Sequence, residues 1–285
     1  MNAGFMQRQQ TNWDWRAAAN FMCGGAGAGL LAFSLAVAPP AVVTIFVGLA
    51  LVGAGLFFVW LEIGRPLRAF NVFIHLRQSW MSREALVASV LFLLGAGLLV
   101  GMSWPGWPTA IVALVFLYCQ ARIVGAARGI PAWRDALTVP LLVATGLAEG
   151  AGLYWLLAAW GAPNALAGPL FGLLVVLRWW LWQAWRGRLA RTAPALALRA
   201  IDDNRARFLH WGGSLPMLLV VAAITPVLPA TVGAILLAIA GALVVATGAG
   251  FKLMLITRAG CLHGFVLPHF PVRGVPRRAS PQENA

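Results

Sequence analysis

Two carboxylates, Glu62 and Glu84, bracket the segment of this chain whose residue types are best suited to chemistry. Between them lie Arg68, Asn71 and His75. Carboxylates take up and release protons, whereas a guanidinium, an amide or an imidazole donates hydrogen bonds to an oxygen atom. The segment therefore predicts a site at which protons are moved and a ligand oxygen is polarised.

Both acids are expected at helix ends, with Glu62 closing one apolar helix and Glu84 opening the next. The helix dipole stabilises an acid at a helix N-terminus, so Glu84 also has a purely structural interpretation. Glu62, at a helix C-terminus, has no such stabilisation. It either forms an ion pair with Arg65 or Arg68 or takes part in chemistry.

Long apolar segments must position these residues. Of the 285 residues, 61% are hydrophobic and 10% are charged, against about 25% charged in a soluble domain. Each segment is close to the roughly 20 residues that span a bilayer. We therefore predict a single all-α integral membrane domain over residues 1–285, an eight-helix bundle with a basic C-terminal tail at 258–285. The predicted helices cover residues 17–38, 41–62, 85–104, 108–127, 136–160, 165–186, 209–228 and 231–256.

All 21 lysine and arginine residues fall on one side of this predicted bundle. The short turns on the other side are rich in proline and glycine and carry no basic residue. The positive-inside rule makes the basic side cytoplasmic, so we expect a multi-pass protein of the inner membrane with both termini in the cytoplasm. This topology accounts for the net charge of +13 without a nucleic-acid partner. Four cations near helix ends are expected to extend to the interface: Arg122, Arg178, Arg186 and Lys252.

Glu149 lies deep within the fifth predicted helix, where acidic residues are functional candidates. Two interpretations remain open: a proton path or distal site, and a neutral, hydrogen-bonded carboxylic acid. No buried basic partner is expected, because Arg122, Arg178 and Lys252 lie towards the basic end of their helices.

Tryptophans and glycines have structural interpretations. Four tryptophans beside Arg178 and Arg186 are typical of an interfacial aromatic belt: Trp179, Trp180, Trp182 and Trp185. The glycine-rich runs 24–29 and 248–250 lack the context of a nucleotide-binding loop, so we expect them to allow close helix packing.

Cysteine and histidine give no sign of a metal centre. Three scattered cysteines form no CxxC or Cys/His cluster, so an iron–sulfur or zinc site and a disulfide framework are not expected. The four histidines are expected in loops, in tails or at a helix end: His75, His210, His263 and His269. A bis-histidine haem needs two histidines inside the bundle, so no haem is expected.

The segment around the two acids resembles the membrane anchor subunits of the dimethyl sulfoxide reductase and polysulfide reductase type (DmsC/NrfD-like). The family pattern is roughly His-Leu-Gly-x-Pro-x-Arg-Ala-Phe-Asn, followed by Ser-x-Glu at the third helix. The matching residues here are Gly64, Pro66, Arg68, Ala69, Phe70, Asn71, Ser82 and Glu84. Glu62 replaces the histidine. Arg122, followed by Ile130-Pro131-Ala132-Trp133, resembles a second family pattern, with Val124 where a tyrosine is common.

The resemblance implies an anchor on which a molybdenum-cofactor catalytic subunit and a four-cluster iron–sulfur subunit dock. It further implies a quinone or quinol bound near the closest cluster, with the other cofactors confined to the partner subunits. Glu84 and Glu62 would relay protons, and the expected quinone-binding residues are Gly64, Arg68, Asn71, His75 and Arg122.

Two other functions remain open: a secondary transporter with one buried acid, and a passive anchor without a redox role. Because the candidate site lies on the basic side, we expect the partner subunits in the cytoplasm and electrons flowing from a cytoplasmic substrate into quinone. Relatives of this kind act on phenylacetyl-CoA or sulfite, and the resemblance favours the phenylacetyl-CoA type.

Overall fold

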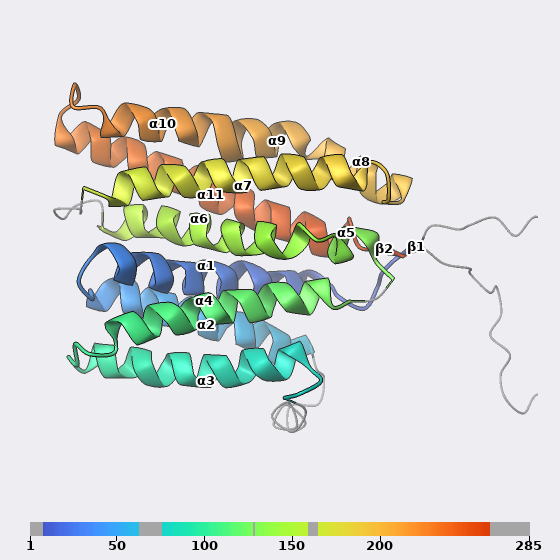
Figure 1. Cartoon of the computed structure of the whole chain (residues 1–285), viewed down its shortest axis with the longest axis horizontal. Helices are drawn as coiled ribbons and strands as arrows, with labels where there is room; N and C mark the ends of the chain where they lie inside the picture. The colour runs from blue at the N-terminus through green and yellow to red at the C-terminus, as the bar shows by residue number, and fades with distance from the viewer. Residues whose placement is uncertain (1–7, 63–75, 128, 159–164, 263–285) are drawn as a thin grey trace, which may run out of the picture.

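A computed structural model describes residues 8–62, 76–127, 129–158 and 165–262. Its long helices lie side by side along the longest axis of the molecule (Figure 1). These helices are α1 (Trp15–Val37), α2 (Val42–Glu62), α3 (Trp80–Leu99), α4 (Gly106–Gly125), α6 (Thr138–Ala158), α7 (Ala167–Leu189), α10 (Leu215–Ile224) and α11 (Ala230–Thr257). Three short helices are α5 (Pro131–Arg134), α8 (Ala195–Asp203) and α9 (Arg205–Leu209).

Seven of the described helices are long and apolar enough to span a membrane, which confirms the all-α membrane class. One of them, Arg205–Ile224, is continuous through α9, a π-helical turn at His210–Ser214, and α10. The predicted span at 165–186 corresponds to α7, which has the required length but is not among the seven. Its four tryptophans and three arginines lower its mean hydropathy. The count of eight spans and the side of each terminus stay predictions.

Helix α1 is the central element of the bundle, and most of its residues are buried. It packs against α2, α4, α6 and α11. The glycines of α1 permit this close approach, as the sequence predicted. A Cβ atom on Gly29 would collide with the backbone of α6 at Gly146, and one on Gly27 would collide with the backbone of α2 at Gly48.

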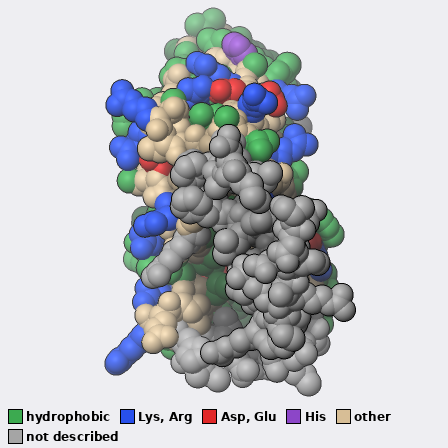
Figure 2. All heavy atoms as spheres, turned by 90° about the vertical axis from the view of Figure 1, so that its right-hand side faces the viewer, with side chains coloured by type: hydrophobic (Ala, Val, Ile, Leu, Met, Phe, Trp, Pro, Cys, Tyr) green, Lys and Arg blue, Asp and Glu red, His purple; other side chains and the backbone are tan. Residues whose placement is uncertain are grey.

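The described basic residues gather towards one end of the bundle. That end carries α5, α8 and the two ends of the described chain, on the right of Figure 1. Viewed end-on in Figure 2, its described surface is rich in lysine and arginine side chains. The described turns at the other end, residues 38–41, 100–105 and 225–229, hold no charged residue. The charge asymmetry read from the sequence is therefore present in the described structure.

A two-stranded antiparallel sheet, which the sequence did not predict, joins the two ends of the described chain. Strand β1 (Arg8–Gln9) pairs with β2 (Cys261–Leu262). Beside it, the side chain of Gln10 donates hydrogen bonds to the carbonyl oxygens of Trp13 and Ile256, at 2.7 and 3.0 Å. The segment before α1 is thereby tied to the end of α11.

Helix α3 begins five residues before its predicted start, at Trp80 instead of residue 85. The hydroxyl of Ser79 caps this earlier start by accepting a hydrogen bond from the backbone N–H of Ser82. As a consequence, Glu84 lies beyond the first turn of α3, and that turn holds no acid. The interpretation of Glu84 as an acid placed for the helix dipole is therefore wrong.

Candidate functional site

A cavity of about 120 Å³ lies at the basic end of the bundle, between α1, α2, α3 and α4. Both acids singled out in the sequence, Glu62 and Glu84, line it. The remaining wall is mostly apolar, and the other lining residues are Trp13, Ala17, Asn20, Phe21, Val59, Met81 and Ile123. The helix ends thus bring together two carboxylates that are 22 positions apart in the sequence.

Glu84 is only 4% exposed. Its carboxyl lies beside the amide side chains of Asn20 and Gln120, while its Oε1 atom has no hydrogen-bond partner among the described residues. A buried oxygen without a partner costs free energy. An arrangement of this kind is typical of a group that binds a ligand or handles a proton.

Glu62 is half-buried at the C-terminal end of α2. Its basic neighbour in the described structure is Arg16, which donates a hydrogen bond to the carbonyl oxygen of Leu61 at 3.3 Å. Arg16 also forms an ion pair with Asp14 at 2.8 Å, and this hydrogen-bonded contact lowers the pKa of the Asp14 carboxyl. The predicted partners Arg65 and Arg68 lie outside the described residues.

Arg122 does not line this cavity. The central carbon of its guanidinium lies 4.9 Å from the ring centroid of Trp80. Arg83 contacts the same ring at 4.3 Å. Both arginines therefore contact the first residue of α3, one turn before Glu84, and neither lines the cavity.

Four predicted quinone-binding residues, Gly64, Arg68, Asn71 and His75, lie outside the described residues. They follow Glu62 in the chain, and their roles stay predictions.

Asn20 and Gln120 were missed by the sequence reasoning. Asn20 is 3% exposed, and its Oδ1 atom has no hydrogen-bond partner among the described residues. Gln120, which is 3% exposed, donates a hydrogen bond to the backbone oxygen of Asn20 at 3.1 Å. Each is an amide within an apolar helix, and a search for isolated amides within the predicted spans would have found both.

Glu149 has a buried basic partner, contrary to the expectation from the sequence. Nζ of Lys252 lies 2.5 Å from Oε2 of Glu149, and the two side chains are 2% and 1% exposed. Lys252 also lines a small space next to Gln120. The expectation failed because Lys252 points into the bundle instead of extending to the interface.

Arg178 is also buried, and its predicted extension to the interface is wrong. Its guanidinium donates hydrogen bonds of 2.9 Å to the backbone oxygen of Val244 and to Oγ1 of Thr247. The prediction that Trp182 and Trp185 belong to an interfacial aromatic belt is wrong, since these side chains are 1% and 0% exposed. Helix α7 packs against α6 and α10, and the two rings contact Phe208 and Phe251 within the core.

His210, predicted near a helix end, lies within a continuous helical segment and is exposed. Among the described residues, no three histidine, cysteine, aspartate or glutamate side chains lie close enough to hold a metal ion. The cavity of Glu62 and Glu84 is a partly apolar space with two proton-carrying carboxyl groups and one buried amide. It can bind a small ligand and exchange protons with it.

The fold and this site define a multi-pass membrane protein with a small, mostly apolar cavity that holds two carboxyl groups at its charged end. The sequence matches the DMSO reductase anchor subunit (DmsC) family over residues 39–249, which is more than half of the chain. The protein belongs to this family and is a membrane anchor subunit of an oxidoreductase. This confirms the predicted resemblance.

A curated relative is similar over part of the chain. It is the C subunit of sulfite dehydrogenase from Allochromatium vinosum, which is 32% identical over 136 residues. The match covers 41% of this chain and 41% of the relative. The chain therefore matches less than half the length of this relative.

Proposed function

We propose that this anchor subunit binds a quinone in the cavity of Glu62 and Glu84 and passes electrons between the quinone pool and its partner subunits. The observation that carries the proposal is that Glu62, Glu84 and Asn20 line the same cavity at the basic end of the bundle. Membership of the anchor family supplies the redox context.

The residues of the cavity fit a quinone head group. Phe21, Val59 and Ile123 provide apolar walls. The amide of Asn20 can donate a hydrogen bond to a carbonyl oxygen, and the unpaired Oε1 of Glu84 can accept one from a hydroxyl. Bound there, the quinone supplies two-electron, two-proton redox chemistry.

This chain's own part is to hold the ring and to move protons. Glu84 holds a proton at its carboxyl, shielded from water by burial. Glu62, half-buried at the end of α2, lies nearer the outside and exchanges that proton with the surroundings. Arg16 and Asp14 fix the end of α2, and thereby the position of Glu62.

The partner subunits in this proposal are a four-cluster iron–sulfur protein and a molybdopterin catalytic subunit. They dock on the basic end, which the positive-inside rule assigns to the cytoplasm. Electrons then flow from a cytoplasmic substrate to the quinone. The similarity to a sulfite dehydrogenase protein favours sulfite as that substrate, with a phenylacetyl-CoA-type substrate as the alternative.

Glu84→Gln in the assembled complex tests the quinone site, because it removes the proton carrier and keeps the shape of the side chain. We expect quinone-linked turnover to fall by about 100-fold or more. Substrate oxidation with an artificial dye that takes electrons directly from the catalytic subunits should be retained.

Asp203→Asn is the matched control, since Asp203 is an exposed acid at the same end of the bundle and does not line the cavity. It should leave both activities unchanged. Equal loss of quinone-linked and dye-linked activity in Glu84→Gln would assign Glu84 a structural role. Full quinone-linked activity in that variant would contradict the proposed proton-carrying role of Glu84.

The substrate proposal is tested separately on the purified complex. Sulfite and phenylacetyl-CoA are each supplied as the electron donor, with a soluble quinone analogue as the acceptor. Sulfite-dependent quinone reduction supports the proposal, and activity with phenylacetyl-CoA alone contradicts the sulfite assignment without affecting the quinone site.

A further inference from the structure

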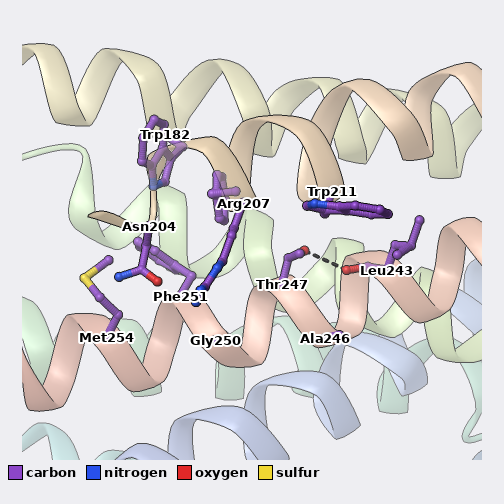
Figure 3. Close-up of a pocket in the computed structure, with 11 residues that line it drawn as sticks. Trp182, Asn204, Arg207, Trp211, Leu243, Ala246, Thr247, Gly250, Phe251 and Met254 are labelled. Carbon is purple, nitrogen blue, oxygen red and sulfur yellow. Dashed lines mark hydrogen bonds between the residues drawn. The ribbon is translucent and has the colours of Figure 1, made fainter. Parts of the chain in front are cut away.

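A second and larger cavity, of about 380 Å³, lies on the opposite side of α1 from the cavity of Glu62 and Glu84. One wall is α11, and the other is the helical run from Asn204 through the π-helical turn (Figure 3). Arg207, Trp211, Ala246 and Gly250 line the cavity and are exposed, so it opens to the surroundings. None of the residues discussed for the quinone lines it.

The α11 wall is a single helix face that runs along the bundle. It extends from Leu243 to Met254, a distance of about 16 Å along the helix axis. This is close to half of the roughly 30 Å hydrocarbon thickness of a bilayer. Because α11 is a candidate membrane span that ends at the basic end, the groove has the length and direction of an acyl chain in one leaflet.

Gly250 leaves the middle of this groove open. A Cβ atom placed on Gly250 would meet nothing within 4 Å. The sequence interpretation of Gly250 as a helix-packing residue is therefore wrong, since packing glycines such as Gly248 face a side chain of a neighbouring helix, here Glu149.

The wall opposite α11 carries a positively charged side chain, Arg207. In Figure 3, the Arg207 side chain crosses from its own helix towards α11 near Gly250. It has no hydrogen bond or ion pair among the described residues, and no acid lines the cavity. Behind the wall, the fully buried Arg178 lies 4.5 Å over the ring of Phe208, which lines the cavity. The nearby acid Glu149 is already paired with Lys252.

We propose that this cavity binds one anionic phospholipid, with its phosphate on Arg207 and an acyl chain along the groove of Leu243, Ala246 and Gly250. The guanidinium of Arg207 forms charge-assisted hydrogen bonds with phosphate. The apolar groove holds the acyl chain of the lipid. A neutral quinone would leave the charge of Arg207 without a counterion.

The test is lipid retention by the complex purified from micelles that contain equal amounts of phosphatidylglycerol and phosphatidylcholine, measured by native mass spectrometry. We expect one phosphatidylglycerol to remain bound in preference to phosphatidylcholine. Arg207→Ala should reduce that retention by about tenfold or more. Arg205→Ala is the matched control, because Arg205 is exposed two residues earlier and does not line the cavity.

A second pair of variants tests whether the open space beside Gly250 holds the lipid. Gly250→Leu fills the groove and should displace the lipid, whereas Gly187→Leu, at an equally open glycine outside the cavity, should not. Equal retention of the two lipids, or loss in the control variants, would overturn the proposal. The proposal would also be overturned if the wild type retained a quinone where phosphatidylglycerol is expected and Gly250→Leu lost that quinone.

Discussion

Nζ of Lys252 on α11 lies 2.5 Å from Oε2 of Glu149 on α6, and the pair is almost completely buried at the centre of the bundle. Two glycines provide the space for it. A Cβ atom on Gly25 of α1 would collide with Lys252, and one on Gly248 of α11 would collide with Glu149. The pair thus joins α6 to α11, and α1 packs closely beside it at Gly25.

Removing one partner of this pair should destabilise the bundle, because the other charge is then buried alone. We expect Lys252→Met to lower the free energy of unfolding by about 3–5 kcal/mol. Thermal unfolding of the protein in detergent measures the change. The double variant Lys252→Met with Glu149→Gln should recover part of the loss, and additive losses in the double variant would show that the two groups are not coupled.

Replacing Gly150 by alanine should also destabilise the fold, since its Cβ atom would collide with the backbone of α1 at Gly29 and Leu30. We expect a loss of about 1–3 kcal/mol, seen as a lower midpoint of thermal unfolding. Gly53→Ala is the matched control within α2, where the new atom would meet only the Phe92 ring at 3.5 Å. A stable Gly150→Ala variant would mean that α1 and α6 are further apart than described.

Asn20→Ala should weaken quinone-linked turnover by about tenfold, because it removes one hydrogen-bond donor from the cavity. Dye-linked activity of the complex should not change. Ser34→Ala is the control, as Ser34 is another buried polar residue on α1 that does not line the cavity. Unchanged quinone kinetics in Asn20→Ala would place the quinone oxygen elsewhere.

The ion pair between Arg186 and Asp202 predicts a stability change in acid. Two hydrogen bonds from the guanidinium, at 2.9 and 2.7 Å, lower the pKa of Asp202 below its ordinary value of 3.8. Because the folded pKa is the lower one, the contribution is complete above the unfolded value and disappears as the pH falls through the folded value. The carboxylate is 39% exposed, so the contribution is below about 1 kcal/mol.

The measurement follows the thermal midpoints of the wild type and Asp202→Asn as the pH is lowered from neutral through the folded pKa of Asp202. We expect a small difference in favour of the wild type at neutral pH that disappears over this range. Asp203→Asn should show no difference at any of these pH values. A difference that persists in acid would mean that Asp202 stabilises α8 by something other than its charge.

Much of the fold followed from apolar length and charge. The segments that became α1, α2, α4, α6 and α11 were placed within a few residues, because a bilayer fixes both the length and the polarity of a span. Helix α3 was misplaced because a capping serine, Ser79, was overlooked. The pairing of β1 with β2 was not predictable, since two residues at each end of the chain give no periodic pattern.

The candidate site was predictable only where side chains lie close in sequence to helix ends. Glu62 and Glu84 were found in that way. The pairing of Lys252 with Glu149 depends on the packing of α6 against α11, which hydropathy does not encode. The burial of Arg178 and Trp185 likewise depends on which face of α7 meets its neighbours, and a helix that is apolar on most faces does not reveal this.

The pairing of β1 with β2 also bears on how the protein is made. Strand β1 is among the earliest described residues to leave the ribosome, and its partner is the last. The first strand can therefore pair only after α11 has been synthesised. A chain that stops before Cys261 would lack the strand with which Arg8 and Gln9 pair.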